Sequence, residues 1–410
     1  MMKFDDLIIM GQDIAEYGGV FKITEGFVEL FGKERVRNTP ICESSIIEIA
    51  MGLSICNRKS IVELQFSDFI TSGFNPVVNY LAKVHYRWGQ NADVVLRMPC
   101  GAGVGAGPFH SQTNEAWFTK TPGLIVVYPA FPDDAKGLLI SSIENPNPVL
   151  FFEHKALYRS IRGKVPEGYY NIEIGKAKLL RVGNDITVIT YGAGVHEAIN
   201  VVDKNSISCD LIDLRTLSPL DDESIINSVN KTGKAIILHE DSLFGGLGSE
   251  ISSIIMENCF ENLDAPVIRV GSLNTPIPFE ESLEKQKNNL EKKVRGNEKE
   301  AKLKLSLIEK ILPEMSEGKP ARELLKLDEE ENSLLPEFNL ITKKPILYVC
   351  NLAENEIKSG NKFTELIRKR AIDNHSGFTV VSAQIEQELS LLSEEDRIDY
   401  LKSMGLNEPT

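Results

Sequence analysis

Short apolar segments alternate with helix-like segments over residues 1–165, and this alternation constrains the fold more than any other feature. The apolar segments read "DLIIMGQD", "KSIVELQF", "ADVVLRMP", "GLIVVYPA" and "PVLFFEH". Helix-like stretches such as Ser44–Ile55 and Gly73–Trp88 lie between them. Strands that are apolar at nearly every position are typical of a parallel sheet with helices on both faces. The sequence therefore predicts an α/β domain at residues 1–165.

The next part of the chain repeats this α/β pattern. "DITVITYGAG", "SCDLIDLRT", "KAIILHED" and "APVIRVGS" have the composition of strands, and "VHEAINVVDKN" and Ser249–Cys259 that of helices. We therefore predict a second α/β domain at residues 166–286, again with a mainly parallel sheet.

The composition changes at "LEKQKNNLEKKVRGNEKEAKLKL", Leu283–Leu305, where about half of the residues are charged. The apolar residues from here on are mostly three, four or seven positions apart, which predicts a helical, coiled-coil-like hairpin at residues 287–335. They are Leu290, Val294, Leu303, Leu307, Ile308 and Ile311.

Residues 336–410 read as a partial α/β fragment. "KPILYVCNLAENE" and "GFTVVSAQIE" each predict a strand followed by a loop, and Lys362–Asp373 predicts a helix. "SEEDRIDYLKSMGL" predicts a last helix, in which Ser393 is the N-cap and Asp396 holds the capping-box position.

Charge and cysteine usage exclude several classes of protein. The net charge of −14 argues against a nucleic-acid binder, because such proteins carry a basic field. No apolar run approaches the ~18 residues of a membrane span, and the acidic N-terminus does not resemble a signal peptide. The six cysteines form no C-x-x-C pair. We therefore expect reduced thiols in the cytoplasm, without membrane or nucleic-acid partners.

Two glycine-rich segments resemble dinucleotide-binding turns. "GAGVGAGPFHSQTNEAWF", Gly101–Phe118, fits G-x-G-x-x-A, but Gly107-Pro108 separates the loop from the next helix, whereas the fingerprint needs a helix that opens directly from the loop. A loop that presents His110 is the alternative, and spacing alone allows an ordinary loop histidine equally well. "YGAGVHEA", Tyr191–Ala198, has better context but lacks the full glycine pattern. A Rossmann-type oxidoreductase is the function that these segments would imply.

Two further segments hold candidate site residues. Glu43 directly precedes an apolar helix, where it either favours the helix dipole or is a partly buried carboxyl that shares a proton with a cofactor nitrogen. Gln65, Phe66 and Phe69 lie near the end of a strand, where α/β sheets build their sites. Core packing is the alternative for the two phenylalanines.

Together these segments resemble one family. "MGQDIAEYGGVFKITEGFVELFG", "TPICES", "ELQFSDF", "GPFHSQTNEAWF", "TPGLIVVYPAFPDDAKGLL", "FFEHKALYRS", "YGAGVHEA" and "DLRTLSPLD" look like the β subunit of thiamine-diphosphate-dependent 2-oxo acid dehydrogenases of the branched-chain (2-oxoisovalerate) type. The resemblance covers residues 3–286. It implies a transketolase-like pyrimidine-binding domain and a transketolase C-terminal domain, and it makes "YGAGVHEA" a structural turn.

The resemblance implies roles for four residues. Glu43 matches the glutamate that bonds the aminopyrimidine ring of thiamine diphosphate and favours the imino tautomer that deprotonates the thiazolium carbon. Phe69 matches the aromatic position beside that ring, and Gln65 lies on the same strand end. His110 matches the histidine that faces the substrate carboxylate and the incoming lipoyl group.

The resemblance also implies ions and partners. Asn145 and Asn147, in "IENPNP", fall where some members hold a structural potassium ion. The chain has no "GDG…N" motif, which in this family holds Mg²⁺ and the diphosphate on the α subunit. We therefore expect half of an active site, completed in an α2β2 assembly. This assembly would decarboxylate a branched-chain 2-oxo acid oxidatively and transfer the acyl group to a lipoyl-bearing acyltransferase.

The tail resembles a different family. "GNEKEAKLKLSLIEKILPEMSEGKPAREL", "NLITKKPILYVCNLAENE" and "VVSAQIEQELSLLSEEDRIDYLKSMGL" look like the middle of a YchF-type, Obg-related P-loop ATPase, over residues 288–410. Asn351 and Glu354 match its adenine-reading NxxE motif, and Ser382-Ala383 its next base-contacting loop. Without the resemblance, Asn351 is equally a plain turn residue. No G-x-x-x-x-G-K-[ST] motif occurs, so we expect no ATPase activity. A translation-linked adaptor that uses this tail is the alternative function.

Overall fold

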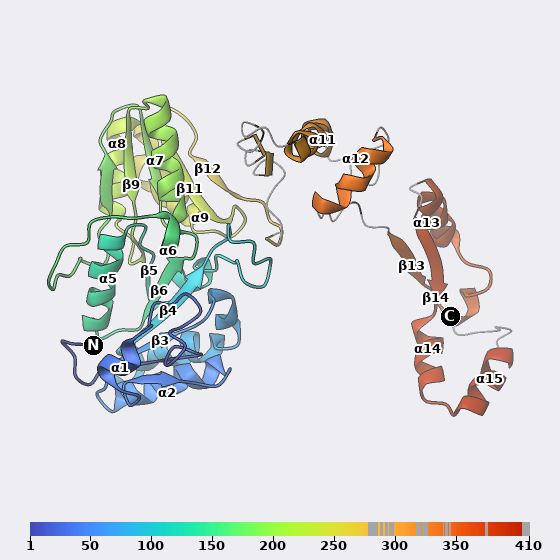
Figure 1. Cartoon of the computed structure of the whole chain (residues 1–410), viewed down its shortest axis with the longest axis horizontal. Helices are drawn as coiled ribbons and strands as arrows, with labels where there is room; N and C mark the ends of the chain where they lie inside the picture. The colour runs from blue at the N-terminus through green and yellow to red at the C-terminus, as the bar shows by residue number, and fades with distance from the viewer. Residues whose placement is uncertain are drawn as a thin grey trace. The chain divides into compact units, whose positions relative to one another are not determined.

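The computed structural model describes most of the chain in two separate units. The described residues are 1–277, 286–287, 290–291, 294, 299–316, 321, 327–338, 340, 343, 346–373 and 376–403. The chain divides into compact units at Met1–Phe279 and Glu280–Thr410, and each is described by itself (Figure 1). Much of Leu283–Leu305, where the composition changes, lies outside the described residues.

The first domain is built on a seven-stranded sheet in the order β10-β5-β6-β4-β3-β1-β2. All neighbours pair in parallel except β10 and β5, which are antiparallel. Every apolar segment predicted as a strand contains one, which confirms the predicted parallel sheet. The strands are β1 (Ile8–Gly11), β2 (Val36–Asn38), β3 (Ser60–Glu63), β4 (Val94–Cys100), β5 (Ile125–Val127), β6 (Val149–His154) and β10 (Thr216–Ser218).

Helices cover both faces of this sheet, which is why its strands are apolar at nearly every position. Neighbouring residues of β4 enter different apolar clusters: Leu96 packs with Ile47 of α2, and Val95 with Leu138 of α5. The predicted helix Gly73–Trp88 is divided into a π-helical turn and an α-helix. The elements are α1 (Phe27–Phe31), α2 (Glu43–Ile55), η1 (Ser67–Thr71), η2 (Pro76–Leu81), α3 (Ala82–Trp88), α4 (Ala116–Thr119), α5 (Pro132–Glu144) and α6 (Leu157–Ser160).

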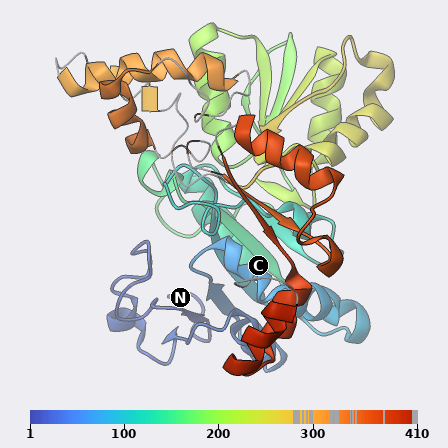
Figure 2. The same cartoon turned by 90° about the vertical axis from the view of Figure 1, so that its right-hand side faces the viewer.

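A five-stranded sheet forms the second domain, in the order β12-β11-β8-β9-β7. Its pairs are parallel except for the edge strand β7, which is antiparallel to β9. Figures 1 and 2 show this sheet in light green to yellow above the first. Its elements are β7 (Lys178–Arg181), β8 (Ile186–Thr190), α7 (Ala193–Asn205), β9 (Cys209–Asp213), α8 (Asp222–Thr232), β11 (Ala235–Ser242), α9 (Gly248–Cys259), η3 (Phe260–Asn262) and β12 (Ile268–Ser272).

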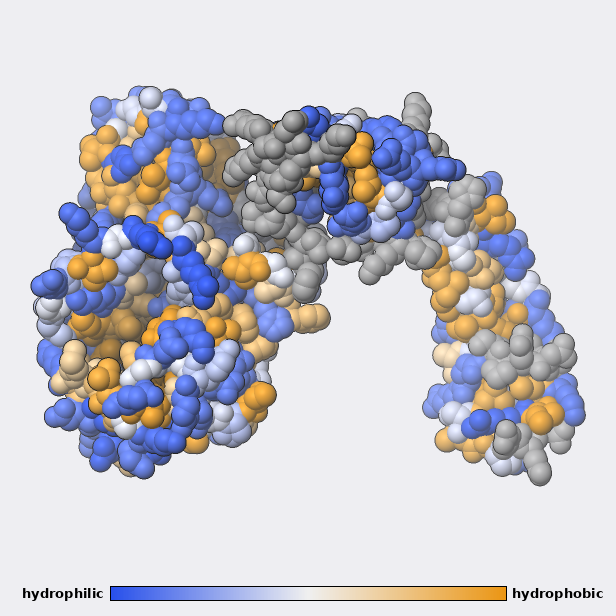
Figure 3. All heavy atoms as spheres, in the orientation of Figure 1, coloured by the Kyte–Doolittle hydropathy of each residue, from blue (hydrophilic) through white to orange (hydrophobic). Residues whose placement is uncertain are grey.

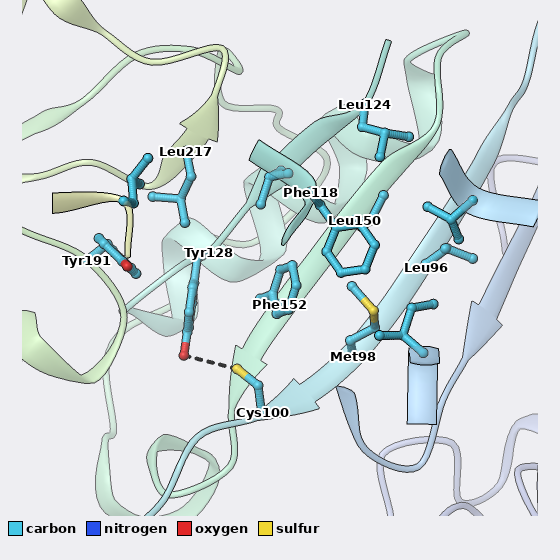
Figure 4. Packing of buried hydrophobic residues seen from close by; sticks show 14 of the residues in the cluster. Leu96, Met98, Cys100, Phe118, Leu124, Tyr128, Leu150, Phe152, Tyr191 and Leu217 are labelled. Atoms are coloured by element: carbon cyan, nitrogen blue, oxygen red, sulfur yellow. Dashed lines mark hydrogen bonds between the residues drawn. The ribbon is translucent and has the colours of Figure 1, made fainter. Parts of the chain in front are cut away.

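The two domains share one apolar core. Figure 4 shows Tyr191 of the second domain, and Leu217 of the strand β10, beside Tyr128 of the first domain; the ring centroids of Tyr128 and Tyr191 lie 5.5 Å apart. Gly192 has φ of 57°, and a Cβ atom on it would lie 2.7 Å from the Tyr128 ring. Gly192, the first glycine in "YGAGVHEA", is therefore required by close packing between the domains.

A buried acid also joins the two domains. Glu115, which is fully buried, accepts a hydrogen bond from the Tyr191 hydroxyl at 2.7 Å. Burial, followed by the charge of Asp241, raises the pKa of Glu115 to about 8. The carboxyl is therefore largely protonated at neutral pH, which makes its position inside the protein far less costly.

The helical part of the second unit packs around one small apolar cluster. Leu307, Ile308 and Ile311 of α11 (Lys299–Ser316) are buried against Leu335 and Phe338 of η5 (Leu335–Phe338), which follows α12 (Glu329–Leu334). Leu307, Ile308 and Ile311 lie on one face of α11, as their helical spacing predicted, while the coiled-coil-like hairpin over residues 287–335 stays a prediction. Among the described helices of the whole chain, none is long and apolar enough to cross a membrane.

The last part of the chain holds two parallel strands, β13 (Leu347–Asn351) and β14 (Gly377–Val381). η7 (Glu354–Glu356) and α13 (Lys362–Asp373) lie between them in the chain, and α13 has the predicted bounds. A helix, α14 (Ala383–Ser390), follows β14 where a loop was predicted, and Asn351 Oδ1 accepts from the Ala383 amide at 2.9 Å. Such an acceptor satisfies a free N–H at a helix start.

Ser393 precedes α15 (Glu394–Ser403) and accepts from the Asp396 amide at 3.3 Å, as predicted.

Candidate active site

Glu43 lies at the start of α2, where three segments of the first domain meet. Its side chain is only 7% exposed. Gln12, just after β1, donates from Nε2 to Glu43 Oε1 at 3.0 Å, and Ser72, just after η1, has its Oγ 3.0 Å from Glu43 Oε2. Both oxygens therefore have neutral donors. The carboxyl is fixed in one orientation, and no cation lies among these partners to neutralise it.

Phe66, Phe69 and His110 form an aromatic cluster close to this carboxyl. Ring centroids are 4.8 Å apart for Phe66 and His110, 5.5 Å for Phe69 and His110, and 5.7 Å for the two phenylalanines, each edge to face. All three side chains are half-buried. The two phenylalanines are therefore not simple core residues, because their rings meet a histidine that remains partly open to solvent.

Ser72 connects the carboxyl to this cluster. Its Oγ lies 3.0 Å from the Phe69 carbonyl oxygen as well as 3.0 Å from Glu43 Oε2. One hydroxyl proton can serve only one acceptor at a time. Glu43 and Phe69 thus share a donor, and the structure brings together these two residues and His110. Gln65 reaches a different partner, since its Nε2 lies 3.5 Å from Asp13 Oδ2.

The sequence did not single out Gln12 and Ser72. Gln12 had a usable signal, because it is a polar residue directly after a buried strand at the carboxyl edge of a parallel sheet. Ser72 had none, since a serine that ends a short turn is commonplace.

The remaining predicted residues lie elsewhere. Asn145 follows α5, and its Oδ1 accepts from both the amide and the Nδ2 of Asn147, at 2.9 and 3.1 Å. In the described part of the chain, no group of three or more His, Cys, Asp or Glu could hold a metal ion. A potassium site at Asn145 and Asn147 stays a prediction.

The nucleotide-fragment residues are in the second unit. Asn351 ends β13 and bonds Ala383, Glu354 begins η7, and Ser382 is fully buried. Adenine binding by these four residues stays a prediction.

Comparison with known families gives two matches. The transketolase pyrimidine-binding domain matches residues 1–160, and the transketolase C-terminal domain matches residues 175–288. Together they cover the two sheets that share the core.

Similarity to curated proteins assigns the chain to a narrower family. The chain is 44% identical over 291 residues to 2-oxoisovalerate dehydrogenase subunit beta of Bacillus subtilis (strain 168). The aligned region covers 70% of this chain and 89% of that protein. The chain belongs to the family of 2-oxo acid dehydrogenase β subunits. Mitochondrial 2-oxoisovalerate dehydrogenase subunit beta 2 of Arabidopsis thaliana is 45% identical over 277 residues, 66% of this chain and 77% of that one. Pyruvate dehydrogenase E1 component subunit beta of Staphylococcus epidermidis is 40% identical over 284 residues, 68% and 87% of the two chains.

A solved structure is similar in fold to this chain. A split-gene transketolase, described as an inactive beta4 tetramer, superposes with a TM-score of 0.55 at 23% identity, covering 69% of this chain and 88% of that one. At this identity the likeness shows the fold alone.

The site around Glu43 fits the cofactor of this family. The 2-oxo acid dehydrogenase β subunits belong to thiamine-diphosphate-dependent enzymes. The pyrimidine half of that cofactor needs a carboxyl to bond a ring nitrogen and an apolar surface beside the ring. A buried carboxyl held by two neutral donors, next to the half-buried Phe69 ring, meets both needs.

Proposed function

We propose that this chain supplies the pyrimidine side of the thiamine diphosphate site in a branched-chain 2-oxo acid dehydrogenase. The carrying observation is the buried Glu43 carboxyl, which Gln12 and Ser72 hold beside Phe69. Bound thiamine diphosphate supplies a thiazolium carbon that adds to the 2-oxo group. Two of the relatives described above are named for 2-oxoisovalerate and one for pyruvate, which supports a short or branched 2-oxo acid as substrate.

Each residue of the site has a distinct role in this proposal. Glu43 holds a proton toward the ring nitrogen of the aminopyrimidine, and its two donors keep the carboxyl aimed. Phe69 packs against the ring, and Gln65 lines the same strand end. His110, partly open beside Phe66 and Phe69, faces the substrate carboxylate and the lipoyl group.

The missing half of the site implies partner subunits. The α subunit of an α2β2 assembly would hold Mg²⁺ and the diphosphate, and a lipoyl-bearing acyltransferase would accept the acyl group. Several large apolar side chains of the first domain are exposed in this chain, among them Ile41, Tyr86 and Trp88 at 84%, 95% and 70%. Figure 3 shows apolar side chains in orange among polar ones on the surface. Such exposed apolar side chains are candidates for the surface that a partner subunit covers. The six cysteines are free, which supports the cytoplasm as location.

Without an α subunit, we expect the purified chain to show no turnover of 2-oxoisovalerate or pyruvate. Adding an α subunit of the branched-chain type with Mg²⁺ and thiamine diphosphate should give substrate-dependent CO₂ release, because the diphosphate is then held. The measurement is ¹⁴CO₂ release with and without α. Turnover by the chain alone would contradict the half-site, and no turnover with any branched-chain α subunit would contradict the function.

We further propose that residues 288–410 are a YchF-like fragment without ATPase activity. Supporting this, Asn351 at the end of β13 accepts from the amide of Ala383 at the start of α14, just after β14, so the two segments that match the base-contacting motifs meet. Without a phosphate-binding loop, we expect ATP binding no tighter than ~1 mM, which calorimetric titration of the full chain measures. Micromolar binding that Asn351→Ala removes would contradict this and revive the translation-linked adaptor as a function of the tail.

A further inference from the structure

The loop that carries His110 begins and ends at the same place. The Gly101 amide donates to the Gln112 carbonyl at 3.1 Å, so the two ends lie side by side. On the Gln112 side, the Gln112 amide donates to Asp68 Oδ1 at 3.1 Å, and Ser67 Oγ donates to the Gln112 carbonyl at 3.3 Å. This end is therefore attached to η1, the turn that also carries Phe69.

The other end is held by two charged side chains of opposite sign. Gly101 O accepts from Lys155 Nζ at 2.6 Å, and the Ala102 amide donates to Glu240 Oε1 at 2.6 Å. Both bonds act on the same peptide group, and both are charge-assisted, the strong class of hydrogen bond. Lys155 is buried, and its Nζ lies 5.6 Å from the centre of the Phe66 ring.

Glu240 reaches this peptide from the other domain. It lies on β11 of the second domain, and its Oε2 is 2.5 Å from His154 Nε2, at the end of β6. Burial acts to raise the pKa of Glu240, but the bonds from His154 and Ala102 hold it below its usual value. The carboxylate therefore stays charged at neutral pH, as both bonds require.

Gly101 makes the close approach possible. Its φ is +86°, and a Cβ atom there would lie 2.1 Å from His154 Nε2. No other residue type fits without moving the histidine. Between the two anchored ends, the described hydrogen bonds of residues 103–111 join loop residues to one another or to Gln112. Phe109, next to His110, is 74% exposed. Apart from the contacts of its ring with Phe66 and Phe69, the position of His110 thus depends on the two anchors.

We propose that Glu240 is a positioning residue of the second domain, which fixes the Gly101–Ala102 peptide and through it the loop that carries His110. The proposal rests on the function proposed for His110, but the anchoring itself does not. It gives the second domain, which supplies no residue to the cofactor site described above, a direct role in the geometry of catalysis.

The test compares Glu240→Ala and Glu240→Gln with Glu257→Ala, an exposed change on α9 of the same domain. Hydrogen exchange of the full chain is followed in peptides from residues 101–115 and from α2. Glu240→Ala should speed exchange in the loop by about tenfold and leave α2 unchanged, because local opening loses one anchor. Glu240→Gln, which keeps an acceptor oxygen, should fall between wild type and Glu240→Ala. Glu257→Ala should match wild type.

Activity in the α-containing assembly gives a second readout. Glu240→Ala should lower kcat by about 10- to 100-fold through misplacement of His110, with half-saturation by thiamine diphosphate changed less than about twofold. Combining Glu240→Gln with Lys155→Met should cost less than the product of the single effects, because both residues hold one peptide.

The outcomes separate this proposal from the proposed function. Unchanged exchange in the loop of both Glu240 variants would overturn the anchoring, whatever the activity. If the effects of Glu240→Gln and Lys155→Met on turnover simply multiply in the double variant, the two residues do not act through one shared peptide group, and that part of the proposal is overturned. Absence of turnover in the wild-type assembly would instead remove the proposed function, while faster loop exchange in Glu240→Ala would still support the anchoring.

Discussion

Glu43→Gln should lower turnover of the α-containing assembly by about 10²- to 10⁴-fold, the usual contribution of a positioned proton donor or acceptor. The amide has nearly the shape of the carboxyl, so the buried position remains filled. It cannot hold a transferable proton. Its nitrogen can take the side of Ser72, whose Oγ then accepts from the amide and donates to the Phe69 carbonyl, so the hydrogen bonds around the side chain are kept. The measurement is ¹⁴CO₂ release from 2-oxoisovalerate at saturating thiamine diphosphate.

Glu48→Gln is the matched control for this prediction. Glu48 lies on the same helix α2 but is exposed, so its change should leave turnover within about twofold of wild type. Circular dichroism and the melting temperature show whether Glu43→Gln still folds. A folded Glu43→Gln assembly with near wild-type turnover would remove Glu43 from the proposed chemistry. Loss of turnover with Glu48→Gln would point to damage to the helix instead.

The fold was predictable because its decisive signal is local. A strand buried on both faces must be apolar at nearly every position. β4 is buried at all seven of its residues, so the apolar segment "ADVVLRMP" predicts a buried strand by itself. The short edge elements had no such signal. β7 is buried only at alternate positions and to an intermediate degree, and β10 is a three-residue strand recruited to the other domain's sheet by antiparallel pairing with β5.

The site was predictable only in its outline. Glu43, Phe69 and His110 stand in long segments that resemble a known family, but the residues that hold them do not. Ser72 and Glu240 act through contacts with residues 29 and 138 positions away in the chain, and such contacts leave no local pattern. α14 was missed for a related reason, because its first amide is bonded by Asn351, 32 positions before it.

Arg97→Met should destabilise the chain by about 3–5 kcal/mol, the usual cost of leaving buried charges without their partner. Arg97, on β4, is only 4% exposed. It donates to Glu63 Oε2 on β3 and to Glu153 Oε2 on β6, both at 2.5 Å. Tyr158 adds a hydrogen bond to Glu153 Oε2 at 2.7 Å. Burial alone would lower the pKa of Arg97, but the charges of Glu153 and Glu63 raise it, so the guanidinium stays charged at any working pH.

Two further variants make this prediction specific. Arg181→Met removes an exposed ion pair with Asp203, and exposed pairs contribute less than about 1 kcal/mol. Adding Glu63→Gln and Glu153→Gln to Arg97→Met should recover much of the loss, because a buried network replaced by neutral groups leaves no unpaired charge. Urea unfolding of the four proteins measures these differences. Equal losses for Arg97→Met and Arg181→Met would show that the buried network contributes no more than a surface pair.

Besides lowering the stability of the whole chain, Arg97→Met should loosen the loop that carries His110. The three strands that the guanidinium joins lead directly to site segments: β3 to Gln65, β4 to Gly101, and β6 to His154 and Lys155. Two of these residues take part in holding the His110 loop. Lys155 donates to the Gly101 carbonyl, and His154 bonds Glu240, which in turn accepts from the Ala102 amide. A charged group at the centre of three parallel strands therefore aligns their carboxyl ends. We accordingly expect Arg97→Met to speed hydrogen exchange at residues 101–115 even in conditions where the chain stays folded, which Arg181→Met should not do.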